Sequence, residues 1–348
     1  MDRLSVAIAA PVPPDVPKLL RQREPRIELR YDPDVLPPMR HPADFAGDPS
    51  FSRTEQEQRR YEDLLDGADA LYGIPDVDAA ALHRVVEANP HLRWVHTMAA
   101  GGGATVKAAR LTDEQLNEIV FTSSAGVHSG PLAEFAIFGV LAGAKDIPRL
   151  TRQQSERVWS GRWMMGQLAE QTMLVIGLGG IGRRVVELLA PFGGTILGTS
   201  RREVTMDGVD EVVHPNQLVE VAGRVDAVIS TLPGTDATAG LLGGDFFAAL
   251  TPGATVVNVG RGTVIDETAL IDALHTGQVG FAALDVFATE PLPPESPLWS
   301  LPNVLISPHT AALSKHEDRR IAEVFCDNAT RLLDGQPLRN VINTEEFY

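Results

Sequence analysis

The chain has 348 residues, with 30 Lys and Arg against 46 Asp and Glu, so its formal net charge at pH 7 is −16. This length suffices for two domains with separate cores, and the acidic balance argues against nucleic acid or an acidic membrane surface as the main partner. The single cysteine, Cys326, excludes an intrachain disulfide framework and multi-cysteine zinc sites, and it fits a reducing cytoplasm. No apolar run approaches the length of a membrane span, and no metal is expected.

The first hundred residues alternate between strand and helix patterns. Residues 4–10 predict a buried strand rather than a signal peptide, because the apolar stretch is short and Pro11 follows it. A helix near 14–23 and a strand over 26–32 come next, and the proline-rich stretch 32–54 is expected to be a long loop. Two more helix–strand units lead to the strand LRWVHT and the turn MAAGGG. This alternation predicts a parallel sheet with helices on its faces.

A new region begins near His128. The stretch from Pro131 to Lys145 is apolar nearly all round, which predicts a buried helix or a subunit interface. A second subunit is expected to cover its apolar residues, which include Leu132, Phe135, Ile137, Phe138, Val140 and Leu141. Strands and helices then alternate again, and the stretch AALSKHEDRRIAEVFCDNATRLLDG predicts a long amphipathic helix. The assembly predicted from this pattern is a homodimer.

A glycine-rich turn follows the apolar strand MLVI. Gly177, Gly179 and Gly182 form G-x-G-x-x-G, and the helix RRVVELLAPF comes directly after them. Glycines at these places allow a tight turn and close approach of the backbone to a pyrophosphate, whose charge the free N–H groups of the helix start attract. The alternative is a plain strand–helix turn, but strand, motif, helix and second strand in this order favour a dinucleotide site.

The second strand of this unit, TILGTS, ends where a ribose-binding acid is expected. The chain has Ser200, Arg201 and Arg202 there instead. A hydroxyl and two guanidinium groups suit the 2′-phosphate of NADP, whereas a carboxylate would repel it. The sequence therefore predicts NADP(H) as the preferred cofactor, with NAD(H) as the alternative if the arginines only face solvent.

Three further polar residues each follow a strand-like run. Arg261 follows VVNVG, Glu290 lies in the loop after LDVF, and His309 follows NVLISP. The ends of parallel strands share one edge, so these residues are expected to converge. Arg261 suits a carboxylate, His309 suits proton transfer near neutral pH, and Glu290 suits holding the imidazole and favouring its protonated form. Taken alone, a histidine after a strand is more often structural, Glu-Pro is a common turn, and an arginine beside glycine is often a loop anchor.

The order and spacing of these stretches resemble the D-isomer-specific 2-hydroxyacid dehydrogenase family, in its hydroxypyruvate/glyoxylate reductase-like branch. The matching stretches are VIGLGGIGRRV, STLPGTDATAGLL, NVGRGTVIDETALIDAL, ALDVFATEPLPPESPLWSLPNVLISPHTA and SSAGVHSGPLAEFAI. The resemblance implies two flavodoxin/Rossmann-like α/β domains with parallel sheets and the active site in the cleft between them. It implies a discontinuous substrate domain, 1–126 plus 309–348, and a dinucleotide-binding domain, 127–308.

The resemblance also implies roles for particular residues. Arg261, Glu290 and His309 match the catalytic positions, and the backbone of Ala100, Gly101 and Gly102, together with Arg261, would hold the substrate carboxylate. The family often has Ala-Gly-Val-Asp where this chain has Ala100 to Gly103, which leaves the turn looser. The cofactor-binding residues are expected to be Gly177, Gly179, Gly180, Ile181, Gly182, Ser200, Arg201, Arg202, Thr231, Leu232, Pro233, Thr238, Val259, Gly260 and Asp285.

The predicted function is reduction of a 2-keto acid to a D-2-hydroxy acid by an oxidoreductase that prefers NADPH, with His309 as the proton donor. The partners expected are the small keto or hydroxy acid and a second copy of the chain, with neither nucleic acid nor a membrane. Two alternatives remain open at this point. One is a dimeric, NAD(H)-sensing corepressor-like binding protein on the same fold, and the other is a formate- or phosphite-type dehydrogenase. The sequence does not identify the keto acid.

Overall fold

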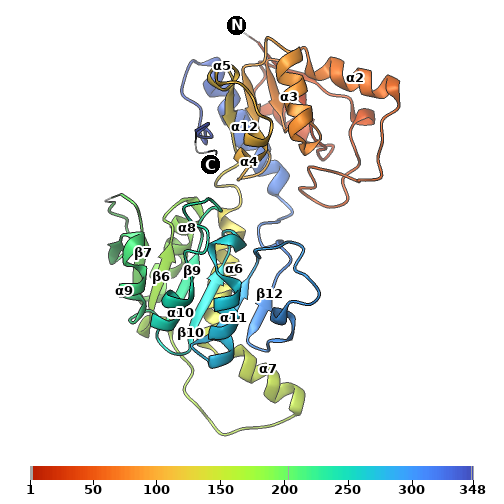
Figure 1. The fold of residues 1–348 in the computed structure, drawn as a ribbon. Helices are drawn as coiled ribbons and strands as arrows, with labels where there is room; N and C mark the ends of the chain where they lie inside the picture. Colours follow the sequence, from red (N-terminus) through yellow and green to blue (C-terminus); the bar gives the residue numbers. More distant parts are fainter. Residues whose placement is uncertain (1–2, 203, 346, 348) are drawn as a thin grey trace. The chain divides into compact units, whose positions relative to one another are not determined.

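The structure, a computed structural model, describes residues 3–202, 204–345 and 347. The chain divides into two compact units. Unit 1 comprises Met1–His128 and Leu313–Tyr348, and unit 2 comprises Ser129–Ala312. The chain therefore passes from one unit to the other twice, and the last helix belongs to the unit that was begun first (Figure 1).

Unit 1 is built on a five-stranded parallel sheet in the order β2-β1-β3-β4-β5. Its strands are β1 (Leu4–Ile8), β2 (Ile27–Arg30), β3 (Ala70–Tyr72), β4 (Trp94–His96) and β5 (Val120–Thr122). Its helices are α1 (Val16–Arg23), α2 (Glu55–Leu65), α3 (Ala79–Ala88), α4 (Gly103–Ala108), α5 (Asp113–Glu118) and α12 (Glu317–Leu333). The predicted loop over 32–54 contains a single turn of 3₁₀-helix, Pro33–Val35, in the described part of the chain.

Helix α12 completes the core of unit 1. Ile321 and Phe325 are fully buried, and the ring of Phe325 stacks on Trp94 with 4.4 Å between centroids. The same ring meets Tyr72 edge-on at 4.9 Å. Aromatic contacts of this kind add to the stabilisation from buried area, so the last helix is part of this core rather than an appendage to it.

Unit 2 is built on a seven-stranded parallel sheet in the order β12-β11-β10-β9-β6-β7-β8. Its strands are β6 (Thr172–Ile176), β7 (Thr195–Thr199), β8 (Glu211–Val213), β9 (Ala227–Ser230), β10 (Ala254–Asn258), β11 (Val279–Leu284) and β12 (Val304–Ile306). Its helices are α6 (Ser129–Ala144), α7 (Ile147–Glu156), α8 (Gly180–Leu189), α9 (Leu218–Ala222), α10 (Gly244–Ala249) and α11 (Glu267–Thr276). The predicted α/β class with two parallel sheets is confirmed.

The strands of unit 2 bury both faces. Alternate residues such as Val256 and Val257 point to opposite sides, because side chains alternate along a strand. Helices α9, α10 and α11 cover one face, and α6 and α8 cover the other (Figure 1). Gly139 and Gly143 let α6 lie close to β10, since a Cβ at either place would meet Val257 or Thr255.

The helix predicted from Pro131 to Lys145 is α6, which ends one residue earlier, at Ala144. Asp146 has φ 54°, which interrupts the helix before α7 begins. Much of α6 is buried in its own unit, but Phe138 stays 52% exposed. No residue of α7 is buried, and the following segment exposes Trp159 and Met164 almost completely.

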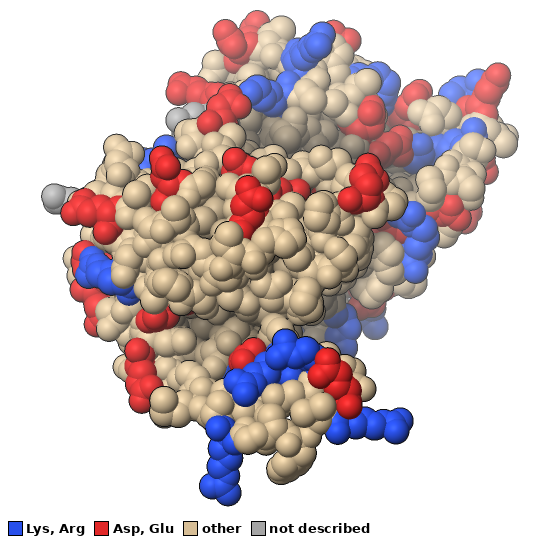
Figure 2. Space-filling model, turned by 60° about the horizontal axis from the view of Figure 1, so that its bottom comes forward, with Lys and Arg blue, Asp and Glu red and all other residues tan. Residues whose placement is uncertain are grey.

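On one face of the molecule, charge is mixed rather than concentrated. On the face drawn in Figure 2, acidic and basic side chains lie around a broad area without charge. None of the described helices combines the length and the apolar character needed to cross a bilayer.

Candidate active site

The glycine-rich turn lies after the interior strand β6, where the order of strands reverses and α/β folds bind ligands. Gly177 has φ 98°, a conformation that favours glycine. Its N–H donates to Thr199 Oγ1 (2.9 Å), and its carbonyl accepts from Thr231 Oγ1 (2.8 Å). The turn is thus held by the ends of both neighbouring strands.

The three glycines of the turn have different uses. A Cβ at Gly182 would overlap the carbonyl oxygen of Gly177, so this glycine permits the helix to pack on the turn. A Cβ at Gly179 would meet nothing within 4 Å, so open space faces that position. Gly179 also precedes α8 without a side-chain cap, which leaves the first N–H groups of that helix, at Gly180 and Ile181, available to an anion.

The end of β7 carries the hydroxyl and the arginines. Ser200 follows Thr199 directly, and its Oγ accepts from the backbone N–H of Arg202 (3.1 Å). The side chains of Arg201 and Arg202 are exposed. This turn places one hydroxyl and two guanidinium groups after the second strand of the dinucleotide-type unit.

The loops after β9 and β10 pack against each other. A Cβ at Gly260 would lie 2.7 Å from the backbone nitrogen of Leu232. Thr238 Oγ1 donates to the Pro233 carbonyl (2.7 Å), and Val259 is buried beneath the second loop. The predicted cofactor residues of this region therefore lie on two loops that pack against each other; they are Thr231, Leu232, Pro233, Thr238, Val259 and Gly260.

Asp285, fully buried after β11, organises the loop that follows β12. Its Oδ1 accepts from Ser307 Oγ (2.6 Å) and from the N–H groups of Thr310 (2.9 Å) and Ala311 (3.0 Å). Its backbone carbonyl accepts from His309 N–H (2.9 Å). Oδ2 is buried and has no partner among the described residues, so one oxygen of this carboxylate is left for another donor.

His309 and Glu290 meet within this frame. His309 Nδ1 lies 2.6 Å from Glu290 Oε2, and Glu290 Oε1 accepts from the Phe287 N–H (3.0 Å). Because an ionised carboxylate accepts and does not donate, we assign the proton of this contact to Nδ1, which leaves Nε2 for another partner. His309 has φ 52°, which is uncommon for a residue with a side chain and occurs at functional sites.

Arg261 follows β10 in a turn that Asn258 fixes. Asn258 is fully buried, its Nδ2 donates to the Arg261 carbonyl (3.0 Å), and its Oδ1 accepts from Gly260 N–H (3.1 Å). Gly262 lies so close to Phe287 that a Cβ would overlap its backbone. The Arg261 turn therefore packs on the segment that leads to Glu290, while the guanidinium itself is exposed and donates to the Gly260 carbonyl (2.8 Å).

In unit 1, the turn that contains Ala100, Gly101 and Gly102 is positioned by its neighbours. The carbonyl of Ala99 accepts from Thr97 Oγ1 (3.1 Å) and from Ser124 N–H (3.3 Å). A Cβ at Gly102 would overlap the Thr97 side chain. No acceptor in the described part of the chain meets the N–H groups of Ala100, Gly101 or Gly102.

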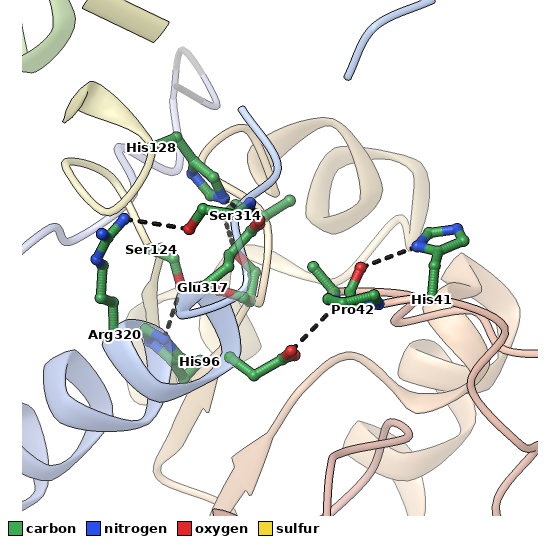
Figure 3. Close-up of polar contacts among 12 residues, drawn as sticks. His41, Pro42, His96, Ser124, His128, Ser314, Glu317 and Arg320 are labelled. Atoms are coloured by element: carbon green, nitrogen blue, oxygen red, sulfur yellow. Dashed lines mark hydrogen bonds and ion pairs between the residues drawn. The ribbon is translucent and has the colours of Figure 1, made fainter. Parts of the chain in front are cut away.

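A buried histidine lies beneath this turn. Burial lowers the pKa of His96 to about 3, so the ring is neutral. Trp94 Nε1 donates to Thr122 Oγ1 (2.8 Å), which lies 2.9 Å from His96 Nδ1. His96 Nε2 lies 3.1 Å from Ser124 Oγ, which donates to the Thr97 carbonyl (Figure 3). If His96 Nε2 carries the ring proton, each N–H and O–H group in this series of hydrogen bonds has an acceptor. We therefore assign that tautomer to His96.

A second buried pair in unit 1 joins the two places where the chain changes unit. His128 Nε2 lies 2.6 Å from Glu317 Oε1, with both side chains nearly buried (Figure 3). Arg320 Nη1 donates to Ser314 Oγ (3.3 Å) close by. This pair fastens the start of α12 to the segment that enters unit 2.

The sequence reasoning did not identify Asn258, Ser307, Thr199, His96 or Ser124. Each is a polar residue at or just after the end of a strand, and that position is the only sequence signal they carry. Within the described residues, no cluster of His, Cys, Asp and Glu has an arrangement that would hold a metal ion.

Residues 137–311 match the protein-family domain described as D-isomer specific 2-hydroxyacid dehydrogenase, NAD binding domain. The chain is 32% identical over 299 residues to a glyoxylate reductase of Aeropyrum pernix, covering 82% of this chain and 87% of that one. It is 33% identical over 230 residues to a D-3-phosphoglycerate dehydrogenase of Archaeoglobus fulgidus, covering 65% of this chain and 43% of that one.

Among solved structures, a D-isomer specific 2-hydroxyacid dehydrogenase from Xanthobacter autotrophicus Py2, in complex with NADPH and MES, superposes with a TM-score of 0.78. It is 29% identical, and the match covers 100% of both chains. The chain thus spans less than half the length of the phosphoglycerate dehydrogenase but the whole of this structure.

Proposed function

The chain belongs to the D-isomer specific 2-hydroxyacid dehydrogenase family, and on that premise we propose that it reduces a 2-keto acid to the D-2-hydroxy acid with NADPH as the preferred dinucleotide. The observation that carries the proposal is the 2.6 Å contact between His309 Nδ1 and Glu290 Oε2. It fits a proton donor whose second nitrogen is free to act.

The residues of unit 2 fit a dinucleotide. The open space at Gly179 and the uncapped start of α8 suit the pyrophosphate, and Ser200, Arg201 and Arg202 suit a 2′-phosphate. The buried, unpartnered Oδ2 of Asp285 suits an amide donor of the cofactor. When bound, the dinucleotide supplies the hydride. The solved relative from Xanthobacter autotrophicus, which contains NADPH, supports the preference for the phosphorylated cofactor.

His309 donates the proton in this proposal. In the direction of reduction, the doubly protonated ring gives the Nε2 proton to the carbonyl oxygen of the substrate and remains bonded through Nδ1 to Glu290. Glu290 holds the ring in one orientation and balances its charge, and the Phe287 N–H fixes the carboxylate in turn. Asp285 fixes the backbone on which His309 is carried.

Arg261 and the unit 1 turn bind the carboxylate of the substrate in this proposal. The exposed guanidinium offers parallel donors to a carboxylate, and its turn is held by Asn258. The free N–H groups of Ala100, Gly101 and Gly102 offer further donors. Holding the carboxylate fixes the position of the neighbouring carbonyl carbon, the atom that receives the hydride. Fixing the reacting atoms in this way accelerates the reaction.

A panel of 2-keto acids assayed with NADPH and with NADH tests the proposal. Glyoxylate, hydroxypyruvate and larger aryl or branched keto acids are the substrates to include, and consumption of the reduced dinucleotide is the measurement. We expect turnover of at least one keto acid, faster with NADPH. No turnover of any keto acid, together with dinucleotide binding, would favour a binding protein instead.

We further propose that the protein is a homodimer. Exposed apolar side chains concentrate on α6, α7 and the segment after them: Phe138, Ile147, Val158, Trp159, Met164 and Met165. A second copy would remove this surface from water, which monomers rarely leave exposed. Light scattering at micromolar concentration tests this, and a monomeric mass would contradict it.

A further inference from the structure

The residues after α12 run along the edge of the unit 1 sheet and reach the turn that contains Ala100 to Gly103, which is called the substrate turn below. Asn340–Glu345 and Phe347 together are called the strap. Val341 forms an antiparallel bridge with Thr122 of the edge strand β5. The Ile342 N–H donates to the Phe121 carbonyl (2.8 Å), and the Asn340 carbonyl accepts from the Ser123 N–H (2.9 Å). The strap is therefore anchored to the sheet by backbone hydrogen bonds.

The far end of the strap rests on Gly103. A Cβ at this position would overlap the carbonyl oxygen of Phe347 and lie 2.6 Å from its carbonyl carbon. The ring of Phe347 is half-buried, and Lys107 Nζ lies 6.0 Å from its centroid. Phe347 thus contacts both the first residue of α4 and a side chain one turn later.

Gly103 has no backbone conformation that requires glycine. It is not among the residues with positive φ, and it lies at the start of a helix, where alanine is normally the better residue. What requires glycine here is the close approach of Phe347. This position therefore depends on the strap rather than on the geometry of the turn itself.

The turn needs an external constraint. It contains three consecutive glycines, Gly101 to Gly103, and glycine loses the most conformational freedom when it is ordered. Thr97 and Ser124 fix its first part through the Ala99 carbonyl. The strap packs on its last part, at Gly103.

We propose that Phe347 is a positioning residue for the substrate turn, which it holds by packing its backbone on Gly103 and its ring beside Lys107. The inference rests on the proposed role of the turn in holding the substrate carboxylate. Phe347 acts through the turn and has no part in proton transfer. Losing the strap lets the free N–H groups of Ala100, Gly101 and Gly102 sample other directions, so the substrate must order them on binding.

Three variants test this: deletion of residues 343–348, Gly103→Ala, and the two combined. Gly244→Ala is the matched control, because it also lies at the start of a helix and a Cβ there meets nothing within 4 Å. If the substrate has to order one residue of the turn when it binds, the entropy cost corresponds to about a tenfold rise in KM for the keto acid. We expect that rise with deletion and with Gly103→Ala, with kcat, NADPH affinity and Tm nearly unchanged.

The combined variant separates the strap from a general effect of alanine. Once the far end of the strap, with Phe347, has been deleted, Gly103→Ala has nothing to displace, so the double variant should have the KM of the deletion or lower. Gly244→Ala should match the wild type. Equal and additive effects of Gly103→Ala with and without the strap would overturn the proposal.

A readout without substrate keeps the strap distinguishable from the proposed function. Backbone ¹⁵N relaxation at residues 99–103 of the free enzyme should give clearly lower order parameters after deletion or in Gly103→Ala, because the turn then moves more freely. If no keto acid is turned over, the proposed function fails, while this measurement still decides whether the strap constrains the turn. Unchanged order parameters after deletion would overturn the strap even in an active enzyme.

Discussion

The pair His309 and Glu290 gives the sharpest test of the chemistry. His309→Gln keeps a side chain of similar length but removes the proton donor, and kcat/KM should fall about 10²- to 10⁴-fold. Glu290→Gln keeps an acceptor for Nδ1 but removes its charge. The two side chains are 45% and 34% exposed, so solvent weakens the pair.

The magnitude for Glu290→Gln follows from the contact. A hydrogen bond to a charged group contributes about 1.5–3 kcal/mol and a neutral one about 1 kcal/mol. For a half-exposed pair the lower end applies, which leaves a loss of about 0.5–1 kcal/mol, or a two- to fivefold fall in kcat.

Steady-state kinetics with saturating NADPH measure both variants, and dinucleotide binding by fluorescence is the control that should not change. Two results would refute the reasoning. One is His309→Gln at near wild-type activity. The other is a loss in Glu290→Gln as large as that in His309→Gln, because Glu290 would then take part in the chemistry itself.

Three further outcomes are expected. Replacing Ser200 by Asp and Arg201 by Ala should reverse an NADPH preference of about 10- to 100-fold, and an unchanged ratio of KM values for the two cofactors would refute the assignment. Hydrogen bonds from Arg26 lower the pKa of Glu24 to about 2, so the contribution of Glu24 to stability is present above pH 4.5 and is lost as the pH falls toward 2. In Glu24→Gln the free energy of unfolding should therefore depend less on pH between 4.5 and 2 than in the wild type, as measured by circular dichroism. His96 stays neutral in the folded protein but becomes protonated in the unfolded chain below pH about 6.5, so its contribution to stability falls as the pH falls. The Tm of His96→Gln should therefore depend less on pH between about 6.5 and 4.5 than the Tm of the wild type.

Local pattern was enough to predict much of the fold. The strands of unit 2 are short apolar runs, and the helices between them have clear boundaries, so the alternation predicted the parallel sheet. The apolar pattern from Pro131 to Lys145 predicted α6 to within two residues at either end, but it did not predict the separate helix α7 that follows. Asp146 adopts a left-handed conformation and caps α7 with its side chain, and the apolar pattern alone does not indicate this second helix start.

The candidate site was predictable for residues that carry a recognisable chemistry. His309 and Glu290 were expected to meet, and the structure places them in contact. Asp285 was expected only as a cofactor-binding residue, and its role in holding the His309 loop was not expected because it depends on distant partners. Asp285 holds the His309 loop through Ser307 and two backbone N–H groups, and nothing in either stretch alone indicates this. The contact of Phe347 with Gly103 joins residues far apart in sequence and is likewise invisible to local pattern.

The discontinuity of unit 1 sets the order in which the chain is able to fold on the ribosome. All of unit 2 is translated between His128 and the start of α12, so unit 2 has its complete core first. Until then, the sheet of unit 1 lacks Phe325, and the faces of Trp94 and Tyr72 that this ring covers stay without their partner. The nascent chain therefore carries an unfinished, aromatic-lined domain during synthesis, and this is the interval in which a chaperone has most to protect.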